Sequence, residues 1–141
     1  MEFSKRILGL DYGTKRIGVA VSDPLRVIAK GLKVVMNSPR AVGEIGAIAE
    51  EYDVQRIVVG MPFNLKGEIG SMAKEVETFM GKLKAATGRE VVPWDERFTS
   101  HTAHETMRSM GVKKLRRRSK TDIDMMASAL ILQGYLDATR S

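Results

Sequence analysis

The stretch RILGLDYGTKRIGVAVSD, Arg6 to Asp23, holds two apolar, β-branched runs on either side of a short polar turn. The runs Arg6–Leu10 and Ile17–Ser22 have the composition of buried strands, and the glycine-containing turn between them is typical of a hairpin. One carboxylate, Asp11, stands where the first run ends. It is either a turn residue, since Asp close to Gly is common turn chemistry, or part of a functional site.

The rest of the chain predicts a mixed sheet with helical crossovers. Pro93 lacks a backbone N–H, so the strand that contains it should lie at an edge of the sheet. Ser38 is a plausible N-cap for the first helix. The expected elements are a strand at Ile28–Met36, a helix from Pro39 to about Glu51, a parallel strand at Arg56–Gly60, a helix from about Ile69 that Gly88 closes, a strand at Glu90–Glu96, a short helix around Ala103–Met110 and a last helix from about Thr121 to Ala138.

This order of elements predicts one α/β domain over residues 1–141. An antiparallel meander that continues into parallel βαβ units fits the ribonuclease H-like architecture. We therefore expect a five-stranded mixed sheet of order 3-2-1-4-5 flanked by helices, with the first strand in its middle.

Composition narrows the class of protein. The chain has 141 residues, 43% of them hydrophobic and 28% charged, as in an ordinary globular domain. Its apolar runs are too short to cross a bilayer, and the four-residue run after Lys5 and Arg6 is too short for a signal peptide. No cysteine is present, which excludes disulfides and thiolate metal sites. We expect a cytoplasmic protein with no membrane partner, either a monomer or a homodimer.

The net charge of +6 is concentrated in KKLRRRSK, where six of eight residues are basic. Cations ahead of a helix N-terminus are disfavoured by the helix dipole, so phosphate binding explains their position better than helix stability does. A solvated loop is the alternative. The candidate nucleic-acid contacts are Lys113, Lys114, Arg116, Arg117, Arg118 and Lys120, with Lys15 and Arg16 of the hairpin turn and Arg97 as further candidates.

Three sources of carboxylate should converge at one edge of the sheet. Asp11 ends the first strand, Glu96 ends the last, and the final helix carries Asp122 and Asp124 in its first turn. Oxygen ligands from separate elements suit Mg²⁺ or Mn²⁺, which activate water for attack on a phosphodiester. Simpler interpretations exist, because Glu96 can pair with Arg97 and TDID matches a capping box. Spacing alone leaves Asp122 and Asp124 equivalent.

Four motifs in order resemble those of the YqgF family, whose members are Holliday-junction-resolvase-like proteins also described as nucleases that mature the 5′ end of pre-16S ribosomal RNA. They are LDYGTKRIGVAVSD, VVGMPFNLKG, DERFTSHTA and, after the basic run, IDMMASALIL. The resemblance runs from Ile7 to about Leu136. It implies a ribonuclease H-like fold, a cytoplasmic location and metal-dependent hydrolysis, with Asp11, Glu96 and Asp124 as catalytic metal ligands.

The resemblance leaves alternative functions open. The segment Gly60-Met61-Pro62 has no carboxylate where true junction resolvases are expected to hold a metal-binding glutamate, so junction resolution is an alternative to RNA maturation. A non-catalytic nucleic-acid-binding module in ribosome assembly or transcription is another. LDYGTKRIG also resembles the phosphate-binding turn of actin-like and hexokinase-like ATPases, but those proteins close two lobes on ATP and this length supplies one.

Overall fold

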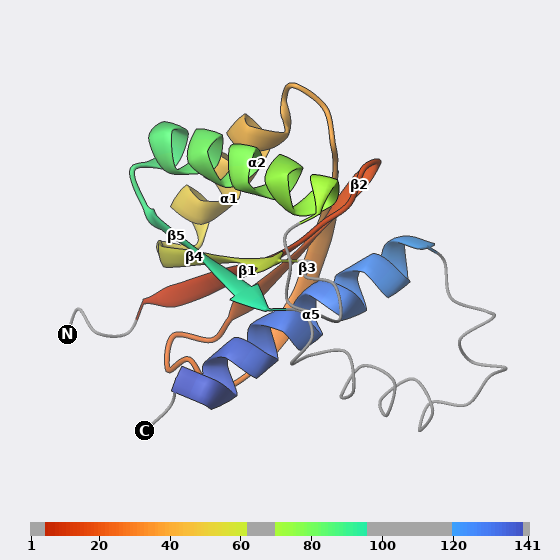
Figure 1. Cartoon of the computed structure of the whole chain (residues 1–141). Helices are drawn as coiled ribbons and strands as arrows, with labels where there is room; N and C mark the ends of the chain where they lie inside the picture. Colours follow the sequence, from red (N-terminus) through yellow and green to blue (C-terminus); the bar gives the residue numbers. More distant parts are fainter. Residues whose placement is uncertain (1–4, 62–69, 96–119, 140–141) are drawn as a thin grey trace, which may run out of the picture.

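A computed structural model of the chain describes residues 5–61, 70–95 and 120–139 (Figure 1). Its strands and helices follow the predicted order. In chain order they are β1 (Arg6–Tyr12), β2 (Arg16–Ser22), β3 (Ala29–Met36), α1 (Ala41–Glu51), β4 (Val54–Met61), α2 (Ser71–Thr87), β5 (Glu90–Asp95) and α5 (Lys120–Thr139). The predicted short helix around Ala103–Met110 lies outside the described residues.

The five strands form one sheet of order β3-β2-β1-β4-β5, which confirms the predicted topology. β1 pairs antiparallel with β2 and parallel with β4, while β3 and β5 form the two edges. The edge position of β5 agrees with the expectation from Pro93. β1 therefore lies in the middle of the sheet, and its C-terminal end carries Asp11.

Helices cover both faces of the sheet: α1 and α2 lie on one face and α5 on the other (Figure 1). Alternation along β1 sends Leu8 and Leu10 into the core beneath α1 and α2, whereas Ile7 packs into the smaller core beneath α5. Among the described residues, no helix is both long and apolar enough to span a membrane.

α2 buries one apolar face, which consists of Ala73, Val76, Phe79 and Leu83. Gly88 closes this helix in the left-handed conformation at φ 67°, as its position predicts. These two features follow from local periodicity and capping chemistry, which act within one helix.

The predicted start of α1 is wrong by two residues. The helix begins at Ala41 with Arg40 as its N-cap, and no side chain caps it. Ser38 instead forms a turn, in which its Oγ accepts a hydrogen bond from the Arg40 amide at 3.2 Å and its carbonyl accepts one from Ala41. The serine hydroxyl thus satisfies a backbone donor one turn before the helix.

α5 lies against the sheet on glycines from three adjacent strands. A Cβ added to Gly18 of β2 would come within 2.3 Å of the Asp124 carbonyl oxygen, and one added to Gly9 of β1 within 2.6 Å of Leu132 Cβ. Gly31 of β3 is in similar contact with Met125. On the helix side Ser128 is fully buried, and its hydroxyl donates to the Met125 carbonyl at 2.8 Å. The close approach of α5 to the sheet therefore depends on glycines in the strands as well as on a small residue in the helix.

Replacing Gly18 by alanine should displace α5, because the new methyl would overlap the backbone of Asp124. Overpacking of this kind lowers the free energy of unfolding by about 1–3 kcal/mol. Gly81→Ala in α2 is the matched control, since no atom lies within 4 Å of its added Cβ. That change should raise stability by about 0.5–1 kcal/mol through helix propensity. Urea denaturation measures both, and equal stability of the two variants would contradict the close helix contact.

Candidate active site

Asp11 is the penultimate residue of β1 and is paired directly with Gly18 of β2. Directly paired residues in an antiparallel ladder share a face of the sheet. A Cβ built on Gly18 would point at the Asp124 backbone of α5, so Gly18 faces α5. Asp11 therefore projects from the same face of the sheet. A half-buried carboxylate therefore stands at the strand end, beside the place where α5 crosses β2.

Asp124 reaches the same place from the helix. Its Oδ2 accepts a hydrogen bond from Arg16 Nε at 2.8 Å, and this ion pair joins α5 to the start of β2. The side chain of Arg16 is 29% exposed to solvent and that of Asp124 is 27% exposed. Arg16, predicted as a phosphate contact, and Asp124, predicted as a metal ligand, thus contact each other at a site that solvent still reaches.

The structure separates the two candidate acids of α5. Asp122 lines a shallow hollow with Gly31 and Met125, on the β3 side of the helix. Asp124 contacts Arg16, beside the strand pair that carries Asp11. Thr121 is already helical, because α5 includes Lys120, so Thr121 is not an N-cap in the way a TDID capping box requires.

The other predicted site residues are less defined. Lys15 is exposed in the hairpin turn, and its carbonyl accepts a hydrogen bond from the Asn37 amide at 2.9 Å. Lys120 opens α5, but its side chain is not described. Glu96, Arg97, Lys113, Lys114, Arg116, Arg117 and Arg118 lie outside the described residues.

β4 and β5 run parallel to β1, so their C-terminal ends lie at the same end of the sheet as Asp11. Met61 ends β4, is buried, and is in register with Asp95 of β5. Trp94 packs in the core beneath α5 and meets the Tyr135 ring edge-on, with the centroids 5.8 Å apart. Because Trp94 lies on the α5 face, alternation places the Asp95 side chain on the face opposite to Asp11.

The donor set favours hard cations. Asp11 and Asp124 offer carboxylate oxygens, and the described ranges contain no cysteine or histidine. Within those ranges, no group of three or more acidic or histidine side chains is close enough to hold a metal ion by itself. The described part of the site is thus a pair of carboxylates with one guanidinium, and a complete metal site would need a further ligand.

The strand order and the flanking helices define the class of fold, which is ribonuclease H-like. Thermus thermophilus RuvC, solved with a Holliday junction substrate, superposes with a TM-score of 0.58 at 19% identity over 95% of this chain and 94% of that one. The fowlpox virus Holliday junction resolvase gives 0.56 at 13% identity over 94% and 99%. These similarities establish the fold.

The chain belongs to the RuvX family, because the family model described as Holliday junction resolvase matches residues 5–138. A proposed pre-16S rRNA nuclease of Ruminiclostridium cellulolyticum is 42% identical over 135 residues, 94% of each chain. Another, from Syntrophus aciditrophicus, is 44% identical over 94% of this chain and 89% of its own. These matches confirm the family indicated by the four motifs.

Sequence reasoning missed the Arg16–Asp124 pair and the role of Gly18. The two charged residues are 108 positions apart, and only the crossing of α5 over β2 brings them together. A usable signal for Gly18 was present, since a glycine inside a strand often marks a close backbone approach.

The Arg16–Asp124 pair should contribute little to stability, because both side chains are partly exposed. A double-mutant cycle with Arg16→Gln and Asp124→Asn should give a coupling free energy below about 1 kcal/mol. Urea denaturation of the four proteins measures it. A coupling above about 2 kcal/mol would mean that the pair fastens α5 to the sheet and is not available to a ligand.

Proposed function

We propose that this protein is a metal-dependent nuclease that hydrolyses phosphodiester bonds, with Asp11, Asp124 and Glu96 as its catalytic carboxylates. The observation that carries this proposal is the convergence of Asp11 and Asp124 on one face of the sheet through Gly18. Two acids from a central strand and from a helix are held there by rigid elements, which suits a site that must keep fixed geometry.

Glu96 completes the proposed set. It follows Asp95, the last residue of β5, in the sequence. Oxygen donors of this kind fit Mg²⁺ or Mn²⁺. When bound, such an ion supplies an activated water and neutralises charge on the phosphate.

Arg16 has a positioning role in this proposal. Its Nε holds Asp124, while its terminal N–H groups have no acceptor in the part of the chain that the structure describes. Beside the Asp124 carboxylate, the terminal N–H groups of this guanidinium can donate to a phosphate oxygen and orient the substrate backbone. Lys15 and Arg97 would extend this contact, and the run from Lys113 to Lys120 would supply the remaining charge.

The proposed substrate is structured RNA, namely the 5′ end of pre-16S rRNA, which the enzyme would meet in the cytoplasm. Its support is the name shared by relatives of more than 40% identity over nearly the whole chain. Cleavage of four-way DNA junctions is the second candidate, which the family description favours. β4 ends at Met61, which has no carboxylate. True junction resolvases are expected to hold a metal-binding glutamate there, so this difference favours RNA as the substrate.

Asp11→Asn and Asp124→Asn should each lower Mg²⁺-dependent cleavage of a pre-16S RNA fragment by at least about a hundredfold, because each removes a charged ligand. RNA affinity should stay within a few-fold of wild type. Single-turnover cleavage assays and binding titrations measure the two effects separately, and a four-way DNA junction is assayed in parallel.

Asp137→Asn is the matched control, because it makes the same change at the exposed far end of the same helix. It should cleave at the wild-type rate. Full activity of Asp11→Asn would refute the proposed site. If the wild-type protein binds both substrates but cleaves neither, the result favours a non-catalytic nucleic-acid-binding module.

A further inference from the structure

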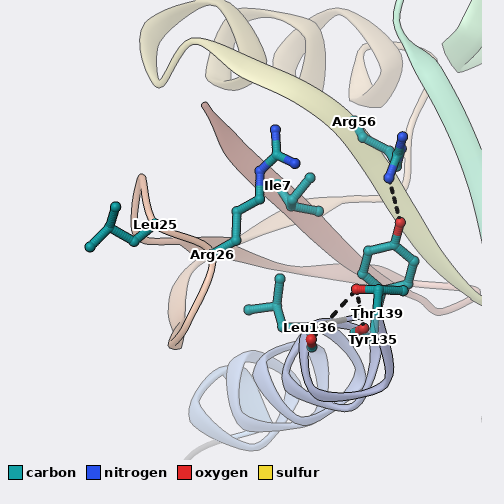
Figure 2. A pocket seen from close by; sticks show the side chains of 7 residues that line it. All are labelled: Ile7, Leu25, Arg26, Arg56, Tyr135, Leu136 and Thr139. Atoms are coloured by element: carbon teal, nitrogen blue, oxygen red, sulfur yellow. Dashed lines mark hydrogen bonds between the residues drawn. The ribbon is translucent and has the colours of Figure 1, made fainter. Parts of the chain in front are cut away.

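A polar pocket lies at the end of the α5 face that is opposite to Asp11. It has a volume of about 250 Å³ and opens between the start of β1, the start of β4, the β2–β3 turn and the end of α5. Figure 2 shows Arg26 and Arg56 extending toward it from either side of Ile7, with Tyr135 and Leu136 of α5 closing the opposite wall. Leu25 and Thr139 complete the lining, which contains two guanidinium groups and no carboxylate.

Arg56 is held in place by two partners. Its Nε donates to Glu90 Oε1 at 2.6 Å and its Nη1 to the Tyr135 hydroxyl at 2.7 Å. These hydrogen bonds, chiefly the one to Glu90, raise the pKa of Arg56 and keep it charged. Since the phenol oxygen already accepts from Arg56, the phenol proton is left to donate to a ligand. Within the described ranges, Nη2 of Arg56 has no acceptor.

Arg26 is placed by an ordered turn. Asp23 Oδ1 accepts hydrogen bonds from the amides of Val27 and Ile28 at 2.7 and 2.9 Å, so the turn is closed by its own side chain. Arg26 adopts a left-handed backbone conformation, φ 59°, which is uncommon for a residue with a side chain. Its guanidinium donates to the Lys5 carbonyl at 2.8 Å and to Gln55. The turn therefore directs a charged side chain across the sheet end.

The chemistry of the lining selects the ligand class. Two fixed guanidiniums and a phenol donor match the oxygens of a phosphate group, for which arginine is the preferred partner. Glu90 offsets one of the two charges but contacts only the Nε side of Arg56. The apolar side chains of Ile7 and Leu136 suit the sugar carbons of a nucleotide unit.

We propose that this pocket is a phosphate-binding subsite for a nucleotide unit, held by Arg26, Arg56 and Tyr135. Ile7 and Asp11 are four residues apart on β1, so about 13 Å of strand separates the pocket from the carboxylates. Leu132 of α5 covers Gly9 between them, so an RNA strand that contacts both places must pass around α5 and not along β1. The phosphate can thus belong to the RNA that reaches the carboxylates, which rests on the proposed nuclease function, or to a free nucleotide.

The test uses the full chain with Asp11→Asn, so that cleavage cannot interfere. Adenosine 5′-monophosphate and a short single-stranded RNA are titrated by calorimetry. Arg56→Gln should weaken binding of the recognised probe by about tenfold or more, because a charge-assisted hydrogen bond is lost. Tyr135→Phe should weaken it by a few-fold while keeping the ring against Trp94. The second variant remains informative if the first is poorly folded.

Arg40→Gln is the matched control, because it removes the same charge from an exposed residue at the start of α1. It should change affinity for the recognised probe much less than Arg56→Gln does. Loss of RNA affinity in the pocket variants identifies a strand phosphate, and loss of monophosphate affinity alone identifies a free nucleotide. If neither probe binds, or if the pocket variants match Arg40→Gln, the subsite does not exist. That result leaves the carboxylate site unaffected, because its cleavage assay is separate.

Discussion

The contact between α5 and three glycine-bearing strands is the constraint on which the rest of the structure depends. Gly9 and Gly18 let α5 approach the sheet more closely than a Cβ at either position would allow, and the space beside Gly31 is tight. The small core beneath α5, with Ile7, Val58 and Leu132, forms because of that approach. The same contact fixes Asp124 above the strand pair that carries Asp11, so packing and site geometry have one cause.

The sequence was sufficient for features that act within one element or between neighbours in the chain. Strand composition, the α2 periodicity, the Gly88 cap and the edge position of Pro93 were all predictable, and the sheet order followed from the element order. The start of α1 was not predictable, because the Ser38 hydroxyl can accept a backbone hydrogen bond either in a turn or as a helix N-cap. The Arg16–Asp124 pair was not either, since it depends on where a helix crosses a strand more than a hundred residues away.

The face of the sheet that carries α5 has two chemically different ends. At one end, Asp11 is paired with Gly18 on β2 and Asp124 of α5 contacts Arg16, an arrangement suited to a cation and a phosphodiester together. At the other end, Arg26 and Arg56 form a cationic pocket without a carboxylate in its lining. A polyanion that passes around α5 could contact a positive anchor at one end and the acidic centre at the other. This division of charge connects the basic composition of the chain with the position of its acids.

The central claim is that Asp11 and Asp124 form one cation site beneath α5. Paramagnetic broadening of backbone amide signals by substoichiometric Mn²⁺ measures it most directly, because the effect falls steeply with distance from the ion. We predict that the signals of Asp11, Gly18 and Asp124 broaden first, and that Asp11→Asn greatly weakens the effect while leaving the fold intact. Broadening centred on exposed acids elsewhere, such as Glu77 of α2, with no effect at Gly18, would contradict the claim.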